Sequence, residues 1–222
     1  PVNKKWWKTS KMKTPSAVVD ILYHPKAKIW FDHHPTTFVD KKWEKKFLPD
    51  LWHKLDTTSP SCTGLICRYL TKTLKMEPPK YIKELARWAD ILDGRLFKLH
   101  KPKDIFDFRV PALRIYYAAG QVKSRAHQEK IIELLSKRSL DNVAKNNMVR
   151  AKFALYEAKF KKSIPLFDKS LSIDGKVILI DDSRGRLHGM KFMEYKYYPK
   201  MPYSVRILKR DGIFILSVGE NP

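Results

Sequence analysis

The sequence has only two cysteines and no long apolar run. Cys62 and Cys67 lie on different faces of a predicted helix, which excludes a disulfide between them and a zinc site built on the pair. No segment approaches the about 20 apolar residues of a membrane-spanning helix, and the basic first residues do not resemble a secretory signal. We therefore expect no membrane association, and a location in the cytoplasm or another reducing compartment such as an organelle matrix.

Acidic residues are also scarce. The 23 Asp and Glu stand against 45 Lys and Arg, which gives a formal net charge of +22. Such a basic protein favours polyanionic partners, here nucleic acid or a nucleotide substrate, although a generally lysine-rich surface is the alternative. A hydrophobic content of 43% with 12% aromatic residues excludes a disordered basic tail.

Short apolar segments alternate with helical ones in the N-terminal part. Ala17–Ile21 and Ala27–Asp32 predict strands. Ser59-Pro60 predicts a helix start with Ser59 as N-cap, followed by a helix over 61–75, and a second helix is expected after Pro78-Pro79. This alternation predicts an α/β fold with a parallel, Rossmann-like sheet.

The C-terminal part predicts a second, smaller mixed-sheet α/β domain. A helical pattern from about residue 124 to 162 predicts a helix that joins two domains, with an apolar stripe that includes Val149 and Phe153. Strands are expected over 176–181, 203–208 and 213–218, with a hairpin turn at Asp211-Gly212. We expect three parts: residues 1–123, 124–163 and 164–222.

Acidic and imidazole side chains follow the predicted strands. Asp20 comes near the end of the first, and Asp32, His33 and His34 end the second. Ligands bind at the carboxyl ends of strands in such sheets, and carboxylates with imidazoles suit Mn²⁺, Zn²⁺ or Fe²⁺ better than Mg²⁺ alone. The pattern alone leaves two interpretations open: a metal site, or two histidines that cap a loop.

The segment VVDILYHPKAKIWFDHHPTTF resembles the DHH phosphoesterase superfamily, named for the triplet found here at Asp32-His33-His34. Three later segments are similar to the family's intervening helix, its later aspartate motif and its associated substrate-binding domain: SPSCTGLICRYL, ADILDGRLF and YSVRILKRDGIFILSVGENP. The resemblance covers the chain from about residue 17 to its end. It implies the fold expected above and hydrolysis of phosphoester bonds.

The resemblance also implies metal ligands. Asp20 would bridge two metal ions, and His33 and Asp93 would each bind one. Asp90 competes with Asp93 for the later position, but Gly94 and Phe97 follow Asp93 as the family pattern expects. The implied cofactor is a divalent metal, Mn²⁺ in preference to Mg²⁺.

Two catalytic roles follow in the same way. His34 would face the substrate phosphate as electrostatic stabiliser or proton donor, and Asp32 would orient an imidazole. Two family features are missing: no Asp, Glu or His precedes Asp20, where the first Asp-x-Asp motif belongs, and no Gly-rich loop with a histidine follows the last strand. We therefore expect the chain to be incomplete or weakly active.

Basic residues interleave with tyrosines near the C-terminus, a pattern that suits phosphate contacts and base stacking. The candidates for substrate or nucleic-acid binding are Arg184, Arg186, His188, Lys191 and Arg206. We expect a metal-dependent phosphoesterase acting on phosphodiester bonds of short oligonucleotides or nucleotides. The alternative is a catalytically degenerate relative that binds RNA as a component of a ribonucleoprotein. Either could form a homodimer or a larger assembly.

Overall fold

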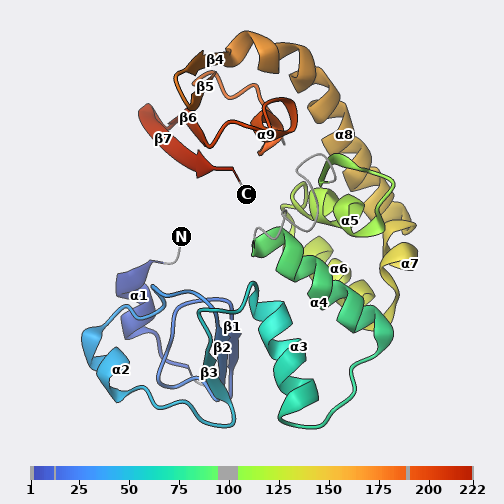
Figure 1. The fold of residues 1–222 in the computed structure, drawn as a ribbon. Coiled ribbons are helices and arrows are strands. Elements are labelled where there is room, and N and C mark those ends of the chain that lie inside the picture. The colour runs from blue at the N-terminus through green and yellow to red at the C-terminus, as the bar shows by residue number, and fades with distance from the viewer. Residues whose placement is uncertain (1–2, 13, 95–104, 189–190, 222) are drawn as a thin grey trace. The chain divides into compact units, whose positions relative to one another are not determined.

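The computed structural model describes residues 3–12, 14–94, 105–188 and 191–221 and divides the chain into two compact units, residues 1–96 and 97–222 (Figure 1). The first unit holds a parallel sheet and the second a mixed sheet, each accompanied by helices. The predicted α/β class is confirmed, whereas the finer division at residues 123 and 163 stays a prediction. Within the described residues, no helix combines the length and the apolar character needed to cross a membrane.

The first unit is built on a three-stranded parallel sheet in the order β1-β2-β3. Its strands are β1 (Ala17–Val19), β2 (Ile29–Asp32) and β3 (His53–Leu55). Its helices are α1 (Lys4–Thr9), α2 (Lys41–Lys46), α3 (Cys62–Lys72) and α4 (Lys80–Asp93). The parallel pairing confirms the sheet type that the alternation of apolar and helical segments predicted.

The central strand β2 is covered on both faces. Trp30 is fully buried in one cluster, with Trp7 of α1 and Val18 of β1. Phe31 points to the other face and packs against Cys62 and Leu65 of α3. Because both faces of β2 are occupied by apolar side chains, the polar residues after it emerge only at the end of the strand.

The first strand ends earlier than expected. Asp20 has a φ of +58°, in the left-handed region that Asp tolerates better than most residues, and β1 therefore stops at Val19 instead of continuing to Ile21. The backbone N–H of Asp20 still donates to the carbonyl of Phe31 at 3.0 Å. Because of this turn, the Asp20 side chain no longer follows the alternation of side chains along β1, and it lies at the carboxyl edge of the sheet.

The start of α3 also differs from the prediction. Ser61, not Ser59, is the N-cap, and its hydroxyl accepts from the backbone N–H of Gly64 at 2.9 Å. Ser59 and Pro60 lie just before the helix, where the Ser59 hydroxyl donates to the carbonyl of Ser61 at 3.2 Å. The displaced cap leaves the Ser59 carbonyl free to meet a side chain of the site.

The second unit begins, within its described part, with helices. They are α5 (Pro111–Ala119), α6 (Arg125–Lys137), α7 (Leu140–Ala144) and α8 (Asn147–Phe167). The expectation of one continuous helix over residues 124–162 is wrong, because Ser139 and Asn146 cap new helices and stop the preceding ones. The stripe that includes Val149 and Phe153 is buried, as the pattern predicted.

A four-stranded mixed sheet completes this unit, in the order β4-β5-β6-β7. After the short 3-10 helix η3 (Asp168–Ser170) come β4 (Leu171–Asp174), β5 (Val177–Asp182), α9 (Met193–Tyr197), β6 (Tyr203–Arg210) and β7 (Ile213–Glu220). Only β5 and β6 are parallel. The turn at Asp211-Gly212 has positive φ at both residues, as a tight hairpin requires.

Candidate metal and phosphate site

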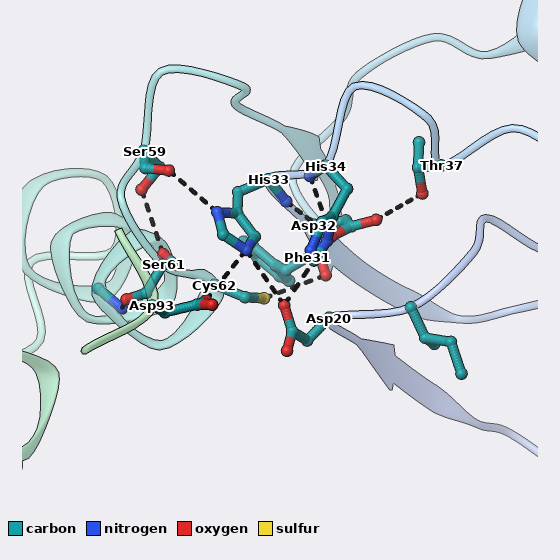
Figure 2. A network of polar contacts seen from close by, with 12 residues as sticks. Asp20, Phe31, Asp32, His33, His34, Thr37, Ser59, Ser61, Cys62 and Asp93 are labelled. Carbon is teal, nitrogen blue, oxygen red and sulfur yellow. Dashed lines mark hydrogen bonds and ion pairs between the residues drawn. The ribbon is translucent and has the colours of Figure 1, made fainter. Parts of the chain in front are cut away.

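Side chains from the ends of β1 and β2 gather at one edge of the first sheet. Ligand atoms of Asp20, Asp32, His33 and His34 all lie within 4.8 Å of one another. Asp93, the last residue of α4, joins them with its Oδ2 3.2 Å from Nε2 of His33. Figure 2 shows Asp20 and Asp93 on either side of that nitrogen. The structure thus brings together the five residues that we expected to bind metal or act in catalysis.

The His33 ring is held in one orientation. Its Nδ1 lies 3.0 Å from the carbonyl oxygen of Ser59, an acceptor that requires the proton to be on Nδ1. The neutral ring then carries a lone pair on Nε2. That atom is buried, and among the described residues it has no hydrogen-bond partner.

The surroundings of this lone pair are suited to a cation. Nε2 of His33 lies 3.4 Å from Oδ1 of Asp20 and 3.2 Å from Oδ2 of Asp93. A lone pair that faces two carboxylates is repulsive unless a proton or a metal ion lies among them. One imidazole and two carboxylates are a donor set for Mn²⁺, and the residues present therefore fit a divalent metal.

Asp32 is a buried acceptor that organises the loop after β2. Its side chain is 1% exposed and accepts from the backbone N–H groups of His33 at 2.8 Å and His34 at 3.3 Å. The hydroxyl of Thr37 donates to its other oxygen. A buried carboxylate with this many donors is directed inward and holds its neighbours in place.

His34 is bound to Asp32 through one nitrogen. Nδ1 of His34 donates to Oδ1 of Asp32 at 2.8 Å, while half of the His34 side chain is exposed. This hydrogen bond raises the pKa of His34 above its ordinary value, and the charges of Asp32, Asp20 and Asp93 act in the same direction against burial. The ring is therefore biased toward the cation, with a second N–H available at Nε2.

Asp20 is affected by the crowding of acids. Burial and then the negative charge of Asp93 raise the pKa of Asp20 above its ordinary value, while His34 and His33 oppose this. Nearby Cys62 donates its thiol to the carbonyl of Phe31 at 3.2 Å. Burial raises the pKa of Cys62 to about 12, so this thiol stays protonated beside the acidic cluster.

Asp90 faces a different partner from Asp93. Ser61 donates its hydroxyl to Oδ1 of Asp90 at 2.7 Å, and the Arg68 guanidinium pairs with the other oxygen. Arg68 also donates to the Ser59 hydroxyl. Asp90 and Arg68 thus connect α4 to α3 and to Ser59, whose carbonyl accepts from His33. Asp90 supports the site without contacting His33 itself.

Two of the predicted basic residues line a hollow beside β4 and β5. Arg184 and Arg186 share this hollow of about 420 Å³ with Lys169. Asp182 builds the loop that carries them, because its buried carboxylate accepts from the backbone N–H of Arg186 at 2.9 Å. Ser163 of α8 anchors the same loop by donating to the Arg186 carbonyl at 3.1 Å.

The remaining predicted contacts have different surroundings. The backbone N–H of His188 donates to the Ser163 hydroxyl at 2.8 Å, and the ammonium of exposed Lys191 lies 4.8 Å from the Phe192 ring centroid. The Arg206 guanidinium pairs at 3.4 Å with the buried Glu194 carboxylate. Phe97 lies outside the described residues.

Sequence reasoning did not identify Thr37, Ser59 or Arg68 as part of the site. Thr37 follows the two histidines closely, which is a weak signal for a supporting hydroxyl. Ser59 acts on His33 through its backbone carbonyl, for which a sequence has no signal. Arg68 is recognisable only once α3 and α4 are seen to pack together.

Comparison with known proteins supports the fold. No protein-family model and no curated protein matches the sequence. Among solved structures, the chain is similar to PggH, a pGpG-specific phosphodiesterase from Vibrio cholerae, with a TM-score of 0.67 and 15% sequence identity. The match covers 91% of this chain and 66% of that chain, so the chain spans just under two thirds of this neighbour. The likeness is one of fold, and it agrees with the predicted α/β class.

Proposed function

We propose that the protein is a metal-dependent phosphoesterase that acts on phosphodiester bonds of short oligonucleotides or nucleotides. The observation that carries this proposal is the buried Nε2 of His33, whose lone pair faces the carboxylates of Asp20 and Asp93. Without a proton on Nε2 or a bound cation, this nitrogen and both acids would repel one another. A divalent cation relieves this repulsion.

The proposed ligands of the metal are Asp20, His33 and Asp93, with Mn²⁺ preferred over Mg²⁺ because an imidazole is among them. When bound, the metal supplies positive charge to a phosphate oxygen and lowers the pKa of a coordinated water. Ser59 keeps the proton of His33 on Nδ1 and thereby keeps Nε2 available. Asp90 and Arg68 hold α4 against α3, and with it the position of Asp93.

We propose that His34 acts as the proton donor and that Asp32 orients its ring. Asp32 fixes the Nδ1 proton of His34, and its charge favours the doubly protonated ring. Nε2–H of that cation is then the donor toward a substrate phosphate or a leaving oxygen. Half of the His34 side chain is exposed, so a substrate can reach it.

The proposed substrate class is a short nucleotide chain. PggH, one structural neighbour, is named for action on the dinucleotide pGpG, and this chain is similar to it in fold. The charge of +22 favours a phosphate-rich substrate. We propose that Arg184 and Arg186, with His188 and Lys191 nearby, contact its backbone, and that Arg206 contributes less because Glu194 neutralises it.

The test is Mn²⁺ binding and hydrolysis of pGpG by the chain and by His33→Ala. We expect Mn²⁺ affinity to fall about tenfold or more in the variant, as for the loss of one ligand, and Mn²⁺-dependent hydrolysis to fall with it. His127→Ala is the matched control, because His127 lies exposed on α6. It is expected to bind Mn²⁺ as the unaltered chain does.

Equal Mn²⁺ affinity and turnover in the chain and in His33→Ala would contradict the site. A chain that binds single-stranded RNA but neither binds Mn²⁺ nor hydrolyses pGpG would favour the alternative role of an RNA-binding component, for which the charge of +22 also speaks.

A further inference from the structure

A second candidate site lies in the helical part of the second unit, between α5 and α8. These helices pack together (Figure 1), and the contact leaves a hollow of about 530 Å³. This size falls within the about 300–1,000 Å³ typical of small-molecule sites. Its polar and aromatic lining consists of Phe108, Arg114, Asn147, Arg150, Phe153 and Glu157.

Arg114 is the unusual member of this lining. Its Nε is buried and has no hydrogen-bond partner among the described residues. The guanidinium carbon lies 5.2 Å from the centroid of the Phe153 ring, which holds the planar group in place by a cation–π contact. A buried N–H donor without an acceptor is costly, and the charged guanidinium makes Arg114 a positive element of the lining.

The charges around the hollow do not cancel. Arg150 is exposed on α8, one helical turn after Asn147, and adds a second positive charge. The carboxylate in the lining belongs to Glu157, which already pairs with Lys161 at 3.4 Å. The lining therefore holds two guanidinium groups and one carboxylate, and that carboxylate is already paired with Lys161.

The start of α8 adds to the positive potential. α8 is 21 residues long and begins at Asn147, which lines the hollow. Its N-cap Asn146 accepts from the backbone N–H of Met148 at 3.0 Å, but the aligned peptide dipoles still favour negative charge near this end. The dipole and the two arginines act in the same direction.

We propose that this hollow binds the phosphate group of a small phosphorylated molecule of about mononucleotide size. Guanidinium forks pair with phosphate oxygens through two parallel hydrogen bonds, and both Arg114 and Arg150 bring such a fork to the lining. The aromatic wall of Phe108 and Phe153 and the Glu157 carboxylate suit the uncharged remainder of such a ligand. All lining residues belong to the second unit, so the inference does not depend on the metal site.

The test measures the binding of inorganic phosphate and of guanosine monophosphate to the full chain in metal-chelating buffer. Calorimetry or phosphorus NMR detects the binding. We expect saturable binding of the nucleotide, competition by phosphate and no binding of guanosine. Arg114→Gln should weaken binding about tenfold or more, and Arg150→Gln several-fold. Arg125→Gln is the matched control, because it removes the same charge from an exposed position on α6.

Three results would overturn the proposal. One is the absence of saturable binding of either probe at millimolar concentration. Another is equal weakening in all three variants, which would indicate attraction by net charge alone. The third is unchanged binding in Arg150→Gln, which keeps the test decisive even if Arg114→Gln fails to fold.

Discussion

Single residues at the end of β2 determine the geometry of the candidate metal site. Asp32 is the central one, because one buried carboxylate serves two backbone N–H groups, the His34 ring and the Thr37 hydroxyl. Its loss would affect both the fold of the loop and the charge of His34.

We expect Asp32→Asn to destabilise the protein by about 1–3 kcal/mol, because an amide puts a donor where donors already point. The variant should also lower the pKa of His34. Because the pKa of His34 is raised in the folded protein, its protonation stabilises the fold fully at pH values below the ordinary pKa of 6.5. This stabilisation is lost as the pH rises through the pKa of the folded state. The part of the destabilisation in Asp32→Asn that comes from His34 is therefore largest in mild acid. Urea unfolding and NMR titration of the ring measure the two effects.

The control for this change is Asp141→Asn. Asp141 is an exposed acid that pairs with Lys145 one helical turn away, a contact of little weight. Equal stability losses in the two variants, or an unchanged His34 titration in Asp32→Asn, would contradict the role of Asp32.

The proximity of the site residues could be predicted from sequence because chemistry and topology agree. Asp20 and His33 each follow a strand, and parallel neighbours place their carboxyl ends at one edge. The Ser59 carbonyl could not be foreseen, since every residue has one. Neither could the Arg206–Glu194 pair, which exists only because β6 passes beside α9.

At the scale of elements, α3 and α4 are held together by a close contact. A Cβ added at Gly64 would lie 2.0 Å from Oδ1 of Asp90, so that only glycine fits there. The same carboxylate takes the Ser61 hydroxyl and Arg68. This contact holds α4, which carries Asp93, against α3.

We expect Gly64→Ala to cost about 1–3 kcal/mol, because the methyl group displaces Asp90 and its partners. Chemical unfolding measures the loss. Gly120→Ala is the control, since the nearest atom to an added Cβ there lies at 3.5 Å, an ordinary contact. A Gly64→Ala variant as stable as Gly120→Ala would show that the helices are not held this way.

A second element-scale prediction concerns the contact of α5 with α8. The rings of Tyr117 and Tyr156 stack with centroids 4.2 Å apart, and burial raises the pKa of both above the ordinary value of 10.0. Above this value the unfolded chain releases these protons while the folded chain keeps them, so stability falls as pH rises.

Tyr156→Phe removes one of these buried phenols, and we expect its stability to decline less steeply in alkali. Circular dichroism together with tyrosinate absorbance across the alkaline range follows the change. Tyr203→Phe is the control, because Tyr203 is 48% exposed. A decline as steep as that of the unaltered chain would contradict the prediction.

Strands with a clear apolar pattern beside a turn signal could be predicted from the sequence, whereas short strands and helix caps could not. β6 and β7 are eight residues each and lie on either side of the Asp211-Gly212 turn, β7 largely apolar and β6 with apolar and polar residues mixed. β3 has only three residues, His53–Leu55, and forms because β2 offers its free edge. The helix ends at Ser139 and Asn146 were missed because apolar periodicity continues across both caps.

At the scale of the whole molecule, charge dominates the expected behaviour. The α/β class with two sheets was predictable from sequence, whereas the placement of the basic residues was not, since it depends on loops such as the one built by Asp182. The +22 charge predicts binding that is sensitive to salt.

We expect the affinity for a short single-stranded RNA to fall steeply with salt, with a slope of about 0.7 per phosphate contact in the double-logarithmic plot. Replacing both Arg184 and Arg186 with glutamine should reduce the slope by about 1.4 if each makes one contact. Filter binding over a range of salt concentrations measures it. A flat response, or a slope that the double variant leaves unchanged, would remove these residues from the interface.

The uneven distribution of one amino acid makes the two units separately observable. All six tryptophans precede residue 97, and Trp30 is fully buried at the centre of the first sheet. Indole emission therefore follows the melting of the N-terminal unit alone, whereas far-ultraviolet dichroism follows both. If the two signals are recorded together, a difference between their unfolding midpoints shows that the unit of residues 1–96 and the unit of residues 97–222 unfold independently.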